Sequence, residues 1–270
     1  MTTTPTGRAP RARVKAPGTD PTDATIDDAC RVLQLPTIRD CHDDIAIAAL
    51  KNHASYKQFL ADLLAAEIHD RGQRRKTRLV REAGFPRPKR LEDFDFDANP
   101  NISPAAVGTL ADPAWVTAGQ PLCLLGDSGT GKSHLLIGIG TAIAEAGLKV
   151  RYSTTANLVN ELVEAADERQ LSKHITRYSK VDLVCLDEFG YLDLDTTGAK
   201  LLFQVFTERE ERKAIAVASN APFSEWKRTF TEPRLCAAIV DRITFHGHIL
   251  ETGTESYRLK TTRNRRQKPT

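Results

Sequence analysis

A glycine-rich segment near the middle of the chain combines a lysine and a hydroxyl in the spacing that binds phosphate. It consists of Gly126, Asp127, Ser128, Gly129, Thr130, Gly131, Lys132 and Ser133, a full match to G-x-x-x-x-G-K-[ST]. The glycines let the backbone curl so that its N–H groups face phosphate oxygens, and a helix beginning near Lys132 adds its positive dipole end. We expect Lys132 to reach the β- and γ-phosphates of ATP, Ser133 to hold Mg²⁺, and His134 to join the nucleotide-binding set.

Two adjacent acids follow an apolar stretch that is typical of a buried strand. The stretch covers 181–186, and Asp187 and Glu188 come directly after it. Carboxylates at the carboxyl edge of a parallel sheet face the ligand crevice. We expect Asp187 to hold the water shell of Mg²⁺ and Glu188 to polarise the attacking water, so that ATP is hydrolysed. The alternative is that the pair caps the next helix.

A polar amide follows a third apolar stretch, at 214–218. Asn220 stands two residues beyond it, just before the turn at Pro222. At the carboxyl edge of the sheet, an amide contacts both the γ-phosphate and the attacking water, which favours a sensor role for Asn220. An ordinary turn asparagine is the alternative.

The elements that must position these residues alternate between strands and helices. The pattern predicts strands over 122–125, 149–153, 181–186 and 214–218, and helices over 132–146, 155–168 and 197–211. Strands separated by helix-length segments indicate a parallel α/β sheet with helices on both faces.

The region before this domain has a helical pattern. Apolar residues at three- and four-residue steps over 56–68 form one stripe, and a polar, acidic linker follows Pro86 and Pro88. We place a domain boundary within 85–100. The predicted organisation is a disordered basic arm over 1–22, a small all-α domain over 23–90, the ATPase domain over 91–260 and a basic tail over 261–270.

Positive charge is concentrated just before this boundary. Residues 71–90 contain nine Lys or Arg and a single acid, Glu82. Such clusters bind nucleic acid by releasing counterions from the phosphates, although a solvated helix face is the alternative. We expect contacts to the backbone of duplex DNA, largely independent of base sequence, from Arg71, Arg74, Arg75, Lys76, Arg78 and Arg81.

Composition excludes several classes of protein. Of the 270 residues 40% are hydrophobic and 27% charged, and no apolar run reaches the roughly 20 residues that span a bilayer. The five cysteines are scattered without a C-x-x-C pair, which favours free thiols in the cytoplasm. His134, His246 and His248 lack a third ligand at a sensible spacing, so we interpret them as structural rather than metal-binding.

Beyond the phosphate-binding segment, several stretches are similar to the IstB-type AAA+ ATPases. These are transposition helpers of bacterial insertion sequences, related to the DnaC helicase loader. The resemblance runs from about residue 25 to residue 260. Its specific parts are Ser-Asn-Ala-Pro-Phe-Ser-Glu-Trp (219–226), Ala-Ile-Val-Asp-Arg-Ile (238–243), the Leu-Glu-Asp-Phe-Asp-Phe linker (91–96) and Glu-Ser-Tyr-Arg-Leu-Lys (255–260). The chain departs from the family in its basic N-terminal arm and in Asp-Glu-Phe-Gly (187–190) after the third strand.

The resemblance implies a homo-oligomer on duplex DNA, with ATP at the subunit interfaces and hydrolysis controlling assembly. It further implies that the assembly regulates an IstA-type transposase. Arg242 would be the finger that reaches a neighbour's γ-phosphate, unless it is a solvated arginine paired with Asp241. Arg234 is a second candidate for a nucleotide contact, and Arg258 is a candidate C-terminal phosphate sensor.

Three other functions share parts of this pattern. A DnaC-like loader of a replicative helicase would have the same ATPase domain and differ in what its N-terminal helices bind. A DNA-bound scaffold would use ATP as a switch with little hydrolysis. A small-molecule kinase would leave Asn220 and Arg242 without a role.

Overall fold

The structure is a computed structural model that describes residues 21–191, 193–230 and 232–257. The predicted arm, the predicted tail and Arg258 therefore lie outside the described residues, apart from positions 21 and 22. The chain forms two compact units that divide between Gln73 and Arg74. Among the described residues, no helix combines the length and the apolar character needed to cross a membrane.

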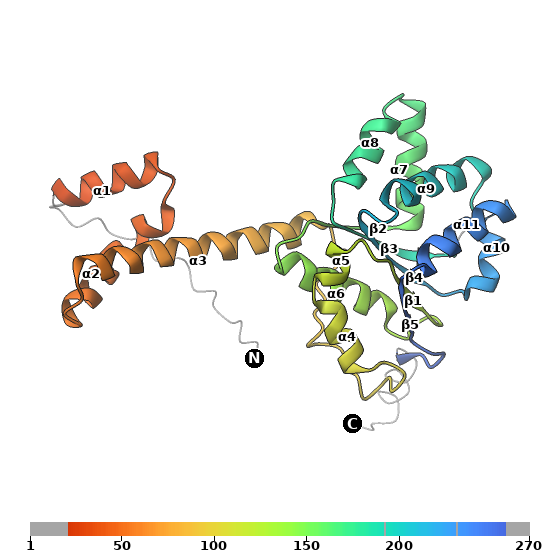
Figure 1. The fold of residues 1–270 in the computed structure, drawn as a ribbon, viewed down its shortest axis with the longest axis horizontal. Helices are drawn as coiled ribbons and strands as arrows, with labels where there is room; N and C mark the ends of the chain where they lie inside the picture. Colours follow the sequence, from red (N-terminus) through yellow and green to blue (C-terminus); the bar gives the residue numbers. More distant parts are fainter. Residues whose placement is uncertain (1–20, 192, 231, 258–270) are drawn as a thin grey trace, which may run out of the picture. The chain divides into compact units, whose positions relative to one another are not determined.

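The first unit is helical, as predicted. It contains α1 (Pro21–Val32), α2 (Pro36–Lys51) and the first part of α3 (Tyr56–Glu82) (Figure 1). A small core forms around Cys30, Ile38 and Leu63.

The predicted apolar stripe over 56–68 is in fact two faces of α3. Leu63 is buried, whereas Tyr56 and Ile68 are 94% and 72% exposed. Residues at positions 56, 60, 64 and 68 share one face because they are four apart, while 59 and 63 lie on another. Only the second of these faces packs into the small core.

The division between the units falls inside α3, earlier in the chain than the predicted boundary at 85–100. The reason is packing, because Leu79 and Ala83 near the end of α3 are buried in the core of the second unit. The segment after the helix continues this packing, since Phe85 lies against the same core.

The second unit is built on a five-stranded sheet whose strand pairs are all parallel. The strands, in the spatial order β2-β3-β4-β1-β5, are β2 (Val150–Thr154), β3 (Leu183–Phe189), β4 (Ala214–Ser219), β1 (Leu122–Leu125) and β5 (His248–Glu251). This confirms the predicted α/β class, and the bounds of β1 agree with the prediction at both ends.

Helices cover both faces of the sheet (Figure 1). They are α4 (Pro104–Ala111), α5 (Ala114–Thr117), α6 (Lys132–Glu145), α7 (Thr155–Asp167), α8 (Leu171–Ser179), α9 (Thr196–Arg209), the 3-10 helix η1 (Phe223–Glu225), α10 (Trp226–Thr229) and α11 (Pro233–Thr244). Successive strand residues enter opposite cores: Val184 lies with α7, α8, α9 and α11, whereas Cys185 lies with α4, α6 and the end of α3. A strand buried on both faces reads as a continuous apolar run, which is why these strands were recognisable.

The strand that carries the two acids is longer than predicted. Asp187 and Glu188 lie within β3, not after it, because Thr154 pairs with Asp187 and Phe189 pairs with Ser219. The helix that follows is capped by a different residue, since the Asp195 side chain accepts a hydrogen bond from Gly198 N at 2.8 Å. Asp187 and Glu188 therefore do not cap α9.

All five cysteines lie among the described residues and are free thiols, as expected. Burial raises the pKa of the Cys123 and Cys185 thiols. Buried thiols in this protonated form are poor nucleophiles, so these residues serve as small apolar side chains in the core.

Candidate nucleotide-binding site

The glycine-rich segment joins β1 to α6, where a phosphate-binding loop is required. Gly129 and Gly131 have φ angles of 86° and 101°, a left-handed conformation that glycine adopts at little cost. Space is limited as well, since a Cβ on Gly131 would lie 2.7 Å from Phe94 Cε2. We call residues 126–133 the phosphate loop.

Lys132 is the first residue of α6 and is only 5% exposed. Its Nζ donates a hydrogen bond to Asp127 O at 2.7 Å, so the ammonium lies against the main chain of the phosphate loop. A buried ammonium needs polar partners, and here the loop carbonyl supplies one. Ser133 follows in the first turn of α6.

A second segment, which sequence reasoning missed, holds the phosphate loop from the side. Thr130 Oγ1 lies 2.5 Å from Thr252 Oγ1, and Asp127 N donates to Gly253 O at 3.0 Å. The buried Asn99 amide joins the two segments, because its Nδ2 donates to Thr130 O at 3.0 Å and to Thr252 O at 2.9 Å. These contacts hold the phosphate loop against the segment that follows β5. No local pattern marks them, since Asn99 and Thr252 are far apart in the chain.

Asp187 lies on β3 at the carboxyl edge of the sheet and is 6% exposed. Its Oδ2 accepts a hydrogen bond from the Tyr152 hydroxyl at 2.9 Å, and its Oδ1 accepts one from Glu188 N at 2.9 Å. Burial, followed by the neighbouring charge of Asp187, raises the pKa of Tyr152. The hydroxyl therefore stays protonated at neutral pH and remains a donor to the carboxylate.

Glu188 is exposed and has a φ angle of 56°. Residues other than glycine, asparagine, aspartate and histidine rarely adopt a positive φ. Backbone strain of this kind concentrates at functional sites. The positive φ of Glu188 lies where the pairing of β3 with β4 changes register, between Leu186 and Phe189.

Asn220 directly follows β4, the strand between β1 and β3. Ser219 pairs with Leu125 of β1 and with Phe189 of β3. Asn220 thus leaves the sheet between the phosphate loop and the strand that carries Asp187 and Glu188. This location fits the predicted sensor, a role that remains a prediction.

His134 and His248 contact other parts of the protein. His134 Nε2 lies 2.8 Å from Arg90 O, and its ring packs edge-on against Phe94 at 5.3 Å. His248 Nε2 lies 3.1 Å from Gln120 Oε1. The contact of His134 with nucleotide remains a prediction.

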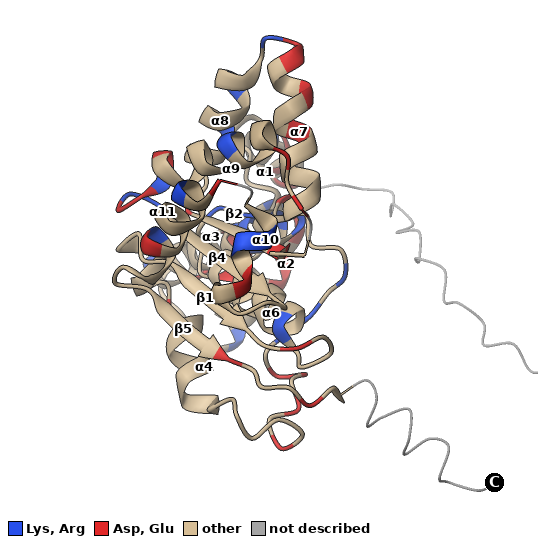
Figure 2. Cartoon of the chain, turned by 90° about the vertical axis from the view of Figure 1, so that its right-hand side faces the viewer, with Lys and Arg blue, Asp and Glu red and all other residues tan. Residues whose placement is uncertain are grey.

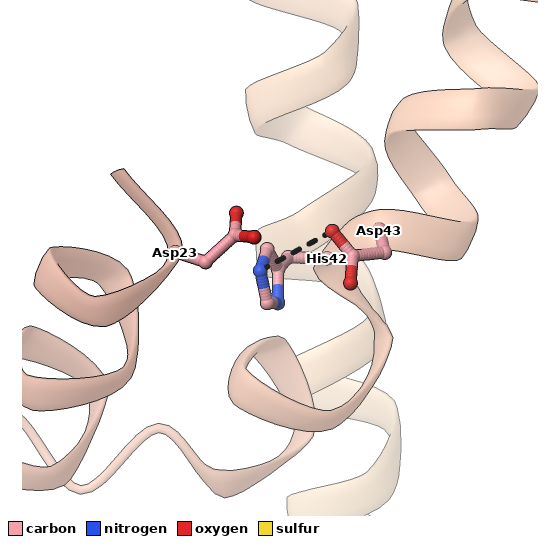
Figure 3. A group of neighbouring side chains, drawn as sticks. All are labelled: Asp23, His42 and Asp43. Atoms are coloured by element: carbon pink, nitrogen blue, oxygen red, sulfur yellow. Dashed lines mark ion pairs between the residues drawn. The ribbon is translucent and has the colours of Figure 1, made fainter. Parts of the chain in front are cut away.

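One group of possible metal ligands occurs in the part of the chain that the structure describes. Asp23, His42 and Asp43 have ligand atoms within 4.8 Å of one another. His42 Nε2 lies 3.5 Å from Asp43 Oδ1, the contact that Figure 3 marks with a dashed line. The group lies in the helical unit, away from the predicted ligands Ser133 and Asp187 in sequence. Asp23 is partly buried and Asp43 is exposed, and exposed acidic groups of this kind are ordinary surface features.

Arg242 lies at the opposite edge of the sheet from the phosphate loop. It lines a cavity of about 300 Å³ together with Pro121 and Ile215, which lie at the amino ends of β1 and β4. Its Nε lies 2.9 Å from Glu210 Oε2, and its guanidinium stacks over Phe203 at 4.8 Å. The acidic partner of Arg242 is thus Glu210, not the Asp241 of the alternative interpretation, and the finger role remains a prediction. Arg234 lies in the first turn of α11.

The basic run continues along α3 into the second unit. All six predicted DNA-contacting residues, Arg71, Arg74, Arg75, Lys76, Arg78 and Arg81, are exposed. Some of them also have protein partners: Arg71 pairs with Glu67 at 3.1 Å, and Arg75 donates to Gly147 O at 3.3 Å. The face that carries α7, α10 and α11 instead mixes both signs of charge (Figure 2).

Comparisons with known proteins support ATP binding. The model of the family described as IstB-like ATP binding protein matches residues 29–265. A putative insertion sequence ATP-binding protein of Sinorhizobium fredii is 38% identical over 227 residues, which cover 84% of this chain and 76% of that protein. The insertion sequence IS5376 putative ATP-binding protein of Geobacillus stearothermophilus is 33% identical over 90% of this chain and 97% of its own length.

A solved structure supports the fold. The replication initiator DnaA bound to AMPPCP and single-stranded DNA superimposes with a TM-score of 0.51 at 22% identity. The match covers 62% of this chain and 50% of that one.

Proposed function

Because this chain belongs to the IstB-like ATP-binding protein family, we propose that it is an ATPase that assembles on duplex DNA and regulates a partner transposase. One observation carries the proposed hydrolysis. Asp187 and Glu188 on β3 lie at the same carboxyl edge of the sheet as the phosphate loop, which follows β1. Asn220 follows β4, the strand between β3 and β1.

Each residue has a role in phosphoryl transfer to water. The phosphate loop and Lys132 bind the phosphates, and the exposed Glu188 carboxylate orients and polarises the attacking water. Asn220 contacts that water and the γ-phosphate. Little covalent chemistry is required of the protein, since positioning and electrostatic stabilisation supply most of the rate enhancement.

The oxygen donors present fit magnesium. The Ser133 hydroxyl and the Asp187 carboxylate are hard oxygen ligands of the kind that Mg²⁺ prefers beside phosphates. When bound, this ion neutralises charge that develops on the phosphate oxygens. Asp187 is oriented for this role by hydrogen bonds to both of its oxygens.

The position of Arg242 supports a site shared between subunits. An arginine at the amino edge of the strands is remote from the phosphate loop of its own chain. In a head-to-tail oligomer the same arginine approaches the phosphates bound by a neighbour. There its guanidinium stabilises the charge of the transition state.

Duplex DNA is the proposed ligand of α3. The exposed arginines and Lys76 between positions 71 and 81 suit backbone phosphates. The transposase is the proposed protein partner, because the relatives are named as insertion sequence ATP-binding proteins. That association favours transposition over helicase loading.

ATP turnover with and without duplex DNA tests this function. We expect DNA to stimulate hydrolysis, and the Glu188→Gln variant to lose it while still binding nucleotide. The matched control is Ser172→Ala, on the exposed surface of α8. Absence of turnover under every DNA condition would contradict the enzyme and leave an ATP-binding scaffold.

A further inference from the structure

Tyr152 connects two parts of the second unit that are far apart in the chain. It lies on β2, at the point where this strand pairs with Cys185 of β3. Its side chain contacts Asp187, the proposed magnesium ligand, and its main-chain N–H donates a hydrogen bond to the residue that follows α3. The sequence indicated only a strand residue here.

On one side, the hydroxyl of Tyr152 donates a hydrogen bond to Asp187 Oδ2 at 2.9 Å. A buried carboxylate with one donor on each oxygen has a single favoured orientation. Groups that hold a ligand in this way are known to tune metal affinity. Removal of the hydroxyl would leave Asp187 Oδ2 without this donor and free the carboxylate to rotate.

On the other side, Tyr152 N donates to Ala83 O at 2.8 Å. Ala83 follows the last turn of α3 and is fully buried. The ring of Tyr152 also packs against Phe85, with centroids 6.0 Å apart. Phe85 in turn packs closely against Gly140 of α6, since a Cβ added to this glycine would lie 3.0 Å from the phenyl ring.

We propose that Tyr152 positions Asp187 for magnesium and transmits changes at the end of α3 to this carboxylate. The inference rests on the proposed function, in which α3 binds DNA and Asp187 serves magnesium. The path is short: the main chain of Ala83, then Tyr152, then the carboxylate of Asp187. A shift of α3 when DNA binds would therefore alter the affinity of the site for magnesium.

The test measures binding, without turnover. A fluorescent, non-hydrolysable ATP analogue is titrated with Mg²⁺ in the full chain, with and without saturating duplex DNA. Tyr152→Phe removes the hydroxyl and retains the ring. The matched control is Tyr178→Phe. The Tyr178 hydroxyl is also part-buried and donates to a carboxylate, Glu161 Oε2, at 2.7 Å, but this pair joins α8 to α7 and does not involve Asp187.

We expect Tyr152→Phe to raise the Mg²⁺ concentration at half-saturation by about tenfold, and Tyr178→Phe to leave it unchanged. Duplex DNA should change the Mg²⁺ concentration at half-saturation of the wild type and leave that of Tyr152→Phe unchanged. The inference is overturned if the Tyr152→Phe and wild-type titrations coincide, or if DNA shifts neither or both equally. A wild-type chain that binds neither analogue nor duplex would instead overturn the proposed function.

Discussion

Arg242 Nε lies 2.9 Å from Glu210 Oε2, in a cavity at the amino edge of the sheet. The pair is partly exposed, with 20% of the Arg242 side chain and 37% of the Glu210 side chain accessible. An arginine that acts on a neighbouring subunit must leave such a partner. In the proposed oligomer, Glu210 would therefore compete with the neighbour's phosphates for this guanidinium.

Glu210→Gln should weaken this competition and raise DNA-stimulated ATP turnover. A partly exposed ion pair is worth up to about 1 kcal/mol, so the increase should be no more than about fivefold. Steady-state hydrolysis at saturating DNA measures it. Glu211→Gln, at the adjacent exposed acid, should behave as wild type. A decrease in turnover with Glu210→Gln would show that the ion pair is needed for catalysis.

The strength of DNA binding should depend on the charges of α3. Removing one Lys or Arg that neutralises a phosphate lowers the slope of log affinity against log salt by about 0.9. Lys76→Ala and Arg81→Ala should each reduce the slope by about this amount, as measured by fluorescence anisotropy with a labelled duplex. Arg228→Ala, on α10 and 82% exposed, is the control. Unchanged slopes for both α3 variants would exclude this helix as the DNA-binding element.

The stability of the N-terminal helices should depend on pH through Glu67. Its Oε2 accepts hydrogen bonds from Thr37 N at 2.8 Å and Ile38 N at 3.2 Å, in the first turn of α2. Burial raises the pKa of Glu67, but these bonds and Arg71 lower it by more, so the pKa lies below its ordinary value of 4.5. The stabilisation is therefore complete above that value and lost as the pH falls through the lower folded pKa.

Glu67→Gln should cost about 1–3 kcal/mol of unfolding free energy near neutral pH and less in acid. Denaturant melts followed by circular dichroism at several pH values give the difference from wild type. Glu82→Gln, whose side chain is 56% exposed, is the control. A difference that stays constant from neutral pH into acid would contradict the role of the ionised carboxylate.

Much of the second unit is predictable because its signals are local. A phosphate loop between a strand and a helix is visible in a few residues, and strands buried on both faces read as apolar runs. The apolar pattern does not predict β5, because this strand has only four residues and both of its ends, His248 and Glu251, are polar. None of its residues is fully buried. The predicted helices of this unit also do not include α4, α5, α8, α10 and α11.

The interactions that complete the site are not local. The bonds of Asn99 to Thr130 and Thr252, and of Tyr152 to Asp187, join segments that meet only in the folded chain. The division of the units inside α3 has the same origin, since it depends on what Leu79 and Ala83 pack against. A single sequence shows composition and periodicity, and neither specifies these partners.

Mixing two inactive variants tests most directly whether one hydrolytic site is built from two subunits. Glu188→Gln retains Arg242, and Arg242→Ala retains a complete phosphate loop with Glu188. Each variant alone should be nearly inactive, and loss of the arginine should cost roughly a thousandfold or more in turnover. Equal mixing on duplex DNA should restore a substantial part of wild-type ATP turnover. Mixtures no more active than the separate variants, in oligomers shown to exchange subunits, would contradict a shared site.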